Sequence, residues 1–151
     1  MIQKFCKKSF LILVLAIFAG SFWATDHARG EAVTIEDMAG RSVSIEGSVQ
    51  RIVCAGPGAL RLITYMNVQD KVVGVEEMEK DPTGRPYAYA NPSFKTLPVI
   101  GPGGPATINQ GPDPEATLNC NPDLIFITYM QKNNADRLQA KLGIPVVVLS
   151  Y

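Results

Sequence analysis

The chain has 151 residues, with 14 basic and 14 acidic side chains and one histidine, His27. This balance provides no basic surface for nucleic acid, so we expect no nucleic-acid partner. Because His27 lies in a segment that we expect to be removed, we also exclude histidine-based metal sites and His-dependent catalytic triads from the remaining chain.

Residues 1–32 are typical of a secretory signal peptide: three lysines precede an apolar stretch over about 10–23, and small residues follow at Gly30 and Ala32. The apolar stretch is shorter than the roughly 20 residues of a membrane span, although a retained anchor is the alternative. Cys6 precedes this stretch, whereas a lipoprotein signal has its cysteine at the end. Cleavage after Ala32 would leave 10 basic and 12 acidic side chains. We therefore expect an exported, periplasmic protein.

The first part of the expected mature chain predicts a β-hairpin followed by a strand, a helix and a strand. In residues 33–45, alternating apolar positions flank the turn-forming sequence "AGR". Residues 51–55 are a short β-rich run, 59–68 have helical apolar spacing, and 70–76 are again β-rich. We assign 33–50 to an N-terminal hairpin and 51–151 to one lobe.

The second part alternates helix and strand after a long irregular stretch. Residues 76–110 are rich in Pro, Gly and Tyr, with one short strand candidate, "LPVIG", and such stretches are functional or disordered. A helix is predicted from Pro114, with Asp113 as its N-cap and Glu115 at its positive end. Then follow a strand, a helix closed by Gly143, and a strand. The apolar runs "LIFI" and "VVVL" favour parallel strands covered on both faces, hence an α/β, Rossmann-like lobe with a mainly parallel sheet. Because the sequence stops directly after an apolar strand, we expect the natural chain to continue.

Two Gly-Pro loops, "GPG" at 56–58 and "GPGGP" at 101–105, raise the question of a nucleotide site. Neither loop ends in the Lys-Ser/Thr of a P-loop, and Arg61 occupies the place of the third glycine of a dinucleotide fingerprint. Both loops nevertheless follow strands, and ligands of open α/β sheets bind outside the carboxyl ends of the strands. We therefore expect Pro57, Gly58, Gly103 and Gly104 to form the rim of a ligand cleft.

Tyrosines are the second candidate ligand group. Tyr87 and Tyr89 alternate within "GRPYAYANP", so in an extended chain both rings would face one side and could contact a planar or chelated ligand. Packing inside a folded loop is the alternative. Arg85 could pair with carboxylate or phosphate groups, and Tyr129 is the last residue of a predicted strand over 123–129. Phenolates of these tyrosines could also bind bare ferric iron.

The remaining candidates predict no catalysis, cofactor or resident metal. The acidic segment "EEMEKD" at 76–81 lacks the ligand pattern of an EF-hand, and we expect a solvated turn. Export permits a disulfide between Cys54 and Cys120, but both lie among apolar residues and two buried thiols are the alternative.

The order of "VTIEDMAGRSVSI", "QRIVCAGPGAL", "DKVVGVE", "DPEATLNCNPDLIFITY" and "LQAKLGIPVVVLSY" resembles the N-terminal lobe of periplasmic substrate-binding proteins of ABC importers for ferric siderophores, cobalamin and haem. The most specific piece is "PEATLNCNPDLIFI". This resemblance implies two α/β lobes joined by a long helix, with the ligand between them. One departure is the first loop, where the family commonly has Pro-Ser-x-Thr-Glu and this chain has "PGALR".

The resemblance also implies a function. The protein would be a monomer that captures a ferric siderophore or related metal chelate, such as cobalamin or haem, and delivers it to an ABC permease in the inner membrane. Glu115 matches the glutamate that docks into the permease in this family. The alternatives are an exported α/β enzyme whose catalytic residues lie in a further C-terminal part, and a sensor or adhesion module.

Overall fold

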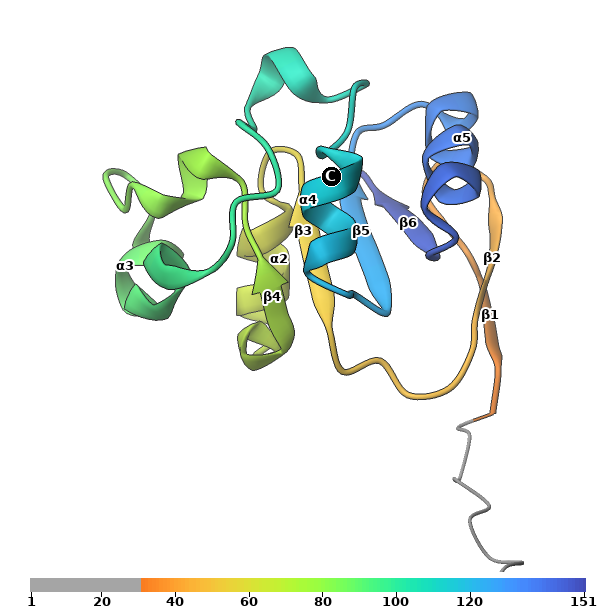
Figure 1. Cartoon of the computed structure of the whole chain (residues 1–151), viewed down its shortest axis with the longest axis horizontal. Helices are drawn as coiled ribbons and strands as arrows, with labels where there is room; N and C mark the ends of the chain where they lie inside the picture. Colours follow the sequence, from red (N-terminus) through yellow and green to blue (C-terminus); the bar gives the residue numbers. More distant parts are fainter. Residues whose placement is uncertain (1–30) are drawn as a thin grey trace, which may run out of the picture.

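The computed structural model describes residues 31–151, so the predicted signal peptide, with Cys6 and His27, falls outside the described residues except at its last two positions. The centre of the fold is a four-stranded parallel sheet in the order β4-β3-β5-β6 (Figure 1). Its strands are β3 (Ile52–Ala55), β4 (Val72–Gly74), β5 (Leu124–Thr128) and β6 (Val146–Leu149). The prediction of an α/β lobe with a mainly parallel sheet is confirmed.

Helices connect the strands and cover both faces of the sheet (Figure 1). The α-helices are α2 (Ala59–Tyr65), α3 (Pro86–Ala90), α4 (Pro114–Asn119) and α5 (Lys132–Leu142). Short 3₁₀ helices complete the connections: η2 (Gln69–Lys71), η3 (Glu77–Lys80), η4 (Pro92–Thr96) and η5 (Pro105–Thr107). Within the described residues, no helix is both long enough and apolar enough to cross a membrane.

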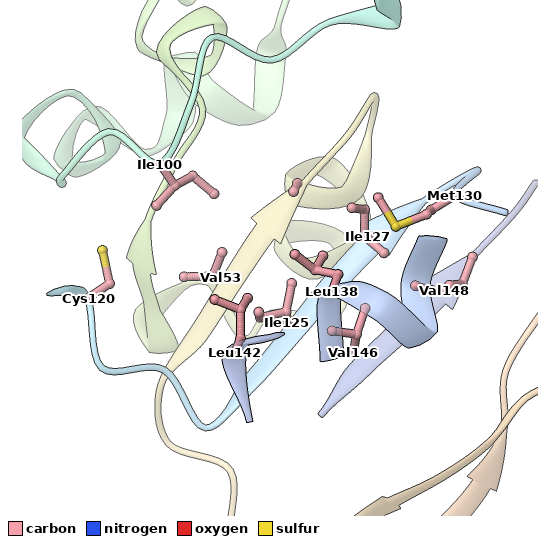
Figure 2. Close-up of a cluster of buried hydrophobic side chains, with 12 residues drawn as sticks. Val53, Ile100, Cys120, Ile125, Ile127, Met130, Leu138, Leu142, Val146 and Val148 are labelled. Carbon is pink, nitrogen blue, oxygen red and sulfur yellow. The ribbon is translucent and has the colours of Figure 1, made fainter. Parts of the chain in front are cut away.

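Successive side chains of a strand point to opposite faces, and this alternation divides the core in two. On one face, Val53, Ile125 and Ile127 pack with Leu138 and Leu142 of α5 (Figure 2). The other face packs mainly against α2, α3 and the segment after α3; its buried members include Ile52, Cys54, Leu60, Ile63, Tyr87 and Phe94. Both faces of the central strands are therefore covered by apolar side chains, as their continuous apolar runs predict.

The two cysteines of the described chain are free and buried. Cys54 belongs to the core layer under α2, whereas Cys120 belongs to the opposite layer with Val53. The sheet therefore lies between the two thiols, and the alternative of two buried thiols describes this structure.

The predicted hairpin forms from β1 (Val33–Glu36) and β2 (Ser42–Ile45), which pair antiparallel. Its turn covers the outer edge of β6. The Val148 N–H donates to Asp37 Oδ2 (3.1 Å), Met38 N–H donates to the Val148 carbonyl (3.0 Å), and Arg41 Nη1 donates to the Val146 carbonyl (2.9 Å). The turn thus satisfies the backbone groups of β6 that would otherwise be an open sheet edge.

The irregular stretch 76–110 differs from its prediction. It contains η3, α3, η4 and η5 rather than structureless chain, and "LPVIG" forms only an isolated parallel bridge between Val75 and Val99. Each of these helices has only three to five residues, which is too short to show a helical periodicity in a Gly- and Pro-rich sequence.

Candidate ligand-binding rim

The first Gly-Pro loop, residues 56–58, leaves the carboxyl end of β3 and leads into α2. Gly56 and Gly58 have positive φ angles of 81° and 78°. A Cβ on Gly56 would lie 2.6 Å from Thr128 Oγ1, so only glycine fits beside the end of β5. The Pro57 carbonyl accepts hydrogen bonds from Thr128 Oγ1 (2.9 Å) and the Tyr151 hydroxyl (3.1 Å). The loop is therefore anchored to the ends of the neighbouring strands.

Two tyrosines and an arginine lie beside this loop. Tyr129 follows β5 with a φ of 61°, an uncommon conformation for a residue with a side chain. Its ring centroid is 5.3 Å from that of Tyr151, and its hydroxyl donates to the Tyr151 carbonyl at 2.7 Å. The Arg61 guanidinium carbon lies 5.0 Å from the Tyr151 ring centroid, a cation–π distance. The first loop thus borders an aromatic and cationic surface made by Tyr129, Tyr151 and Arg61.

The second Gly-Pro loop, residues 101–104, is joined to the first through Glu76. The Gly56 N–H donates to Glu76 Oε1 at 2.9 Å, and Glu76 is only 4% exposed. A Cβ on Gly103 would lie 2.7 Å from both Cβ and Oε2 of Glu76, so Gly103 packs directly against this side chain. Gly104 is buried close by, where its Cβ would face Met78 Sδ at 3.8 Å. We call the two loops, with Arg61, Tyr129 and Tyr151, the loop rim.

The second tyrosine group has a different geometry from the one expected. Residues Pro86–Ala90 form α3, and positions two apart on a helix face different directions. Tyr87 is buried and donates to Glu79 Oε2 (2.7 Å), whereas Tyr89 is 80% exposed. The expectation that both rings face one side of an extended chain is therefore wrong. Arg85 and Tyr89 instead line an open hollow of about 380 Å³ with Pro82, Gly84 and Pro86.

The acidic segment is also different from a solvated turn. Glu79 is 3% exposed, and with Glu76 it forms a pair of buried carboxylates beneath the first loop. Burial raises the pKa of Glu79, although the hydrogen bond from Tyr87 and the charge of Arg85, 3.8 Å away, oppose the rise. Burial likewise raises the pKa of Glu76, and the hydrogen bond from Gly56 opposes it. Sequence reasoning missed both groups, and the one available signal was that Glu76 directly ends the apolar run "VVGV".

Glu115 lies in the first turn of α4 and is exposed. The predicted cap is confirmed, because Asp113 Oδ1 accepts the Ala116 N–H at 2.8 Å. The Asp113 N–H donates to the Ile100 carbonyl (2.7 Å), so α4 begins directly beside the residue that precedes the second loop. Glu115 therefore lies near the loop rim, at the carboxyl edge of the sheet.

No group of three or more His, Cys, Asp or Glu side chains within residues 31–151 is arranged to hold a metal ion. The rim offers hydrogen bonding from backbone and phenol groups, aromatic contact and the charge of Arg61.

Comparison with known proteins gives the fold its class. No family model and no curated protein matches the chain. Solved structures do: a haem-binding protein, HmuT, has 23% identity and a TM-score of 0.56 over 85% of this chain and 37% of its own. MolA, the molybdate periplasmic binding protein of a Haemophilus influenzae ABC transporter, has 24% identity and a TM-score of 0.64, covering 78% of this chain and 34% of its own. VctP, a catecholate-siderophore binding protein of Vibrio cholerae, has 28% identity and a TM-score of 0.57, covering 78% and 37%.

MolA is a periplasmic binding protein of an ABC transporter, VctP is a periplasmic siderophore-binding protein, and HmuT binds haem. The resemblance to periplasmic binding proteins inferred from the sequence is confirmed. The described chain has the fold of one α/β lobe of such proteins. It spans between 34% and 37% of the length of the three neighbours. The neighbours are binding proteins rather than enzymes.

Proposed function

We propose that this protein is the substrate-binding component of an ABC importer, and that it captures a ferric siderophore or related metal chelate in the periplasm for delivery to an inner-membrane permease. One observation carries the proposal: two Gly-Pro loops far apart in sequence meet at the carboxyl edge of the parallel sheet, next to Tyr129, Tyr151 and Arg61. Ligands of open α/β sheets bind at this edge.

The chemistry of the rim suits a chelate or another flat, partly anionic molecule. Tyrosine rings offer apolar faces with few rotatable bonds, and Arg61 supplies a charge that attracts carboxylate or catecholate oxygens. We assign ligand contact to Pro57, Gly58, Gly103, Gly104 and Tyr129. The structural neighbours support the class of ligand, because they include haem-binding and siderophore-binding proteins. Arg85 and Tyr89 remain candidates for the outer part of the site. Tyr87 would act indirectly, through Glu79.

A ligand panel tests the proposal. The full-length mature protein would be titrated with a ferric tris-catecholate, haem, cobalamin, molybdate and ferric citrate. Binding is followed by calorimetry and by intrinsic protein fluorescence. We expect one member to bind with a micromolar or lower dissociation constant. Binding of every member weaker than about 1 mM, near −4 kcal/mol, contradicts the proposal.

Glu115 is the proposed docking residue for the permease. It is exposed, lies near the rim, and forms no ion pair with any other residue in 31–151. Glu115→Arg should abolish uptake of the bound ligand into cells and leave its dissociation constant unchanged. Glu46→Arg, at an exposed glutamate just after β2, is the matched control and should leave uptake intact. Normal uptake by Glu115→Arg would remove this role.

A further inference from the structure

The Glu76 side chain contacts both Gly-Pro loops. Glu76 lies two positions after the end of β4, and its Oε1 accepts the N–H of Gly56 in the first loop at 2.9 Å. On its other side, the α-carbon of Gly103 in the second loop lies so close that any Cβ would collide with the carboxylate. The spacing of the two loops is therefore set by the length and position of this one side chain.

Backbone hydrogen bonds fix the second loop to the same segment. The Glu77 N–H donates to the Gly101 carbonyl at 2.8 Å, and the Met78 N–H donates to the Pro102 carbonyl at 3.3 Å. The second loop would consequently stay with residues 76–78 if the carboxylate were removed. The first loop is joined to Glu76 differently. Here the hydrogen bond from the Gly56 N–H goes to the Glu76 side chain and would be lost with the carboxylate.

The charges around Glu76 come from four elements. Glu79 of η3 repels it, and Cys54 of β3 is a buried thiol whose pKa is raised by burial and by both glutamates. Arg61 of α2 and Arg85 before α3 are the nearby cations, and both act on Glu79. Burial raises the pKa of Glu76 itself above its usual 4.5. The carboxylate is ionised above that raised pKa, and as the pH falls through it the charge-assisted hydrogen bond becomes a weaker neutral one.

We propose that Glu76 is a positioning residue of the ligand site: ionised, it holds the two Gly-Pro loops at the spacing that the ligand requires, and its protonation weakens the link to Gly56 of the first loop and thereby weakens ligand binding. The predicted effect on ligand binding rests on the proposed function. The strap, by which we mean the contacts of Glu76 with Gly56 and Gly103, is present in the protein without a ligand. Glutamine keeps an oxygen acceptor at this position without a titration, and alanine keeps neither.

The test compares Glu76→Ala and Glu76→Gln with Glu77→Gln, a neighbouring exposed glutamate, in the full-length protein. Two readouts are needed: amide hydrogen exchange at Gly56, and affinity for the ferric tris-catecholate or, if that complex does not bind, for haem, cobalamin or molybdate. For Glu76→Ala we expect about tenfold faster exchange at Gly56 and about tenfold weaker binding at neutral pH, the effect of losing one charge-assisted hydrogen bond. Glu77→Gln should match the wild type.

The pH profile separates positioning from a merely structural role. As the pH falls from neutral towards the usual carboxyl pKa near 4.5, the wild type should lose protection at Gly56 and lose affinity, whereas Glu76→Gln should change little in either readout. Unchanged Gly56 exchange in Glu76→Ala, or the same pH profile in Glu76→Gln as in the wild type, would overturn the inference. If Glu76→Ala does not fold, the glutamine profile decides alone. Failure of the proposed function has a different signature, because the wild type then binds none of the ligands while Gly56 exchange still reports on the strap.

Discussion

Two groups of buried charges lie at opposite sides of the sheet, and they are built differently. At the β6 edge, Asp37 accepts four hydrogen bonds, from the N–H groups of Ala39, Arg41 and Val148 and from Arg41 Nη1. Beyond β4, Glu76 accepts one hydrogen bond and Glu79 accepts one. The first group is saturated with partners, whereas the second has spare acceptor capacity.

Arg41 completes the first group. Its guanidinium donates to Asp37, to the Val146 carbonyl, to Asp136 (2.7 Å) and to Gln139 Oε1 (2.8 Å), so it joins the hairpin to β6 and α5. This network holds the hairpin, β6 and α5 together, because removing the Arg41 guanidinium leaves the buried Asp37 carboxylate without its counter-charge. Carboxylates with few partners tolerate a change of protonation, and the loop rim is where such a change would alter ligand contacts.

The largest expected effect comes from breaking the saturated group. Arg41→Ala should lower the free energy of unfolding by about 3–5 kcal/mol, since Asp37 remains buried without its counter-charge. Urea denaturation followed by circular dichroism measures this loss. The freed edge of β6 should also raise the tendency to aggregate, which light scattering would detect.

Glu36→Ala is the control for Arg41→Ala, because Glu36 is an exposed carboxylate of the same hairpin. Its effect should stay within about 0.5 kcal/mol. If both variants lose the same small amount, the hairpin is not fixed to β6 by this network, and the contrast between the two groups fails.

An intermediate effect is expected at Gly56, which links the second group to β5. Gly56→Ala places a methyl group 2.6 Å from Thr128 Oγ1 in a left-handed backbone conformation. Gly84→Ala has a similar φ of 70° but meets nothing within 4 Å, so it isolates the conformational cost of about 1–2 kcal/mol. Gly56→Ala should cost about 1–2 kcal/mol more than this control and weaken ligand binding. Equal losses in the two variants would mean that the loop moves freely away from β5.

The sequence predicted the elements whose cause is local. Alternating residues gave the hairpin, apolar runs gave β5 and β6, and the cap at Asp113 and the glycine at 143 gave the ends of α4 and α5. It did not predict either buried charge group. Asp37 looks like a turn residue, and its partner Val148 lies 111 positions away.

The candidate site was predicted in part for the same reason. The first Gly-Pro loop and Tyr129 follow strands β3 and β5, and the second loop follows the isolated parallel bridge at Val99. Because parallel segments end at one edge of the sheet, the topology brings these residues there. The role of Glu76 depends on Gly56, 20 positions earlier, and on Gly103 in another loop. Tyr87 and Tyr89 were misplaced because a helix of five residues in a Pro- and Gly-rich segment has too little periodicity to recognise.

The smallest expected effect tests whether burial of the ionised Glu79 carboxylate, in the second group, lowers the stability of the protein. Burial raises the pKa of Glu79, so the folded protein takes up a proton more readily there than the unfolded chain. Its contribution to stability is therefore complete below the usual carboxyl pKa near 4.5 and is lost as the pH rises through the raised value.

Glu79→Gln removes this titration while its side-chain oxygen can still accept from Tyr87. The free energy of unfolding of the wild type minus that of Glu79→Gln should consequently increase as the pH falls from about 7 to about 5. Urea denaturation at the two pH values measures the difference, with Glu77→Gln as the exposed control that should show none. A difference that is constant, or that moves the other way, would place Glu79 with the satisfied charges of the β6 edge rather than with a group poised to titrate beside the loop rim.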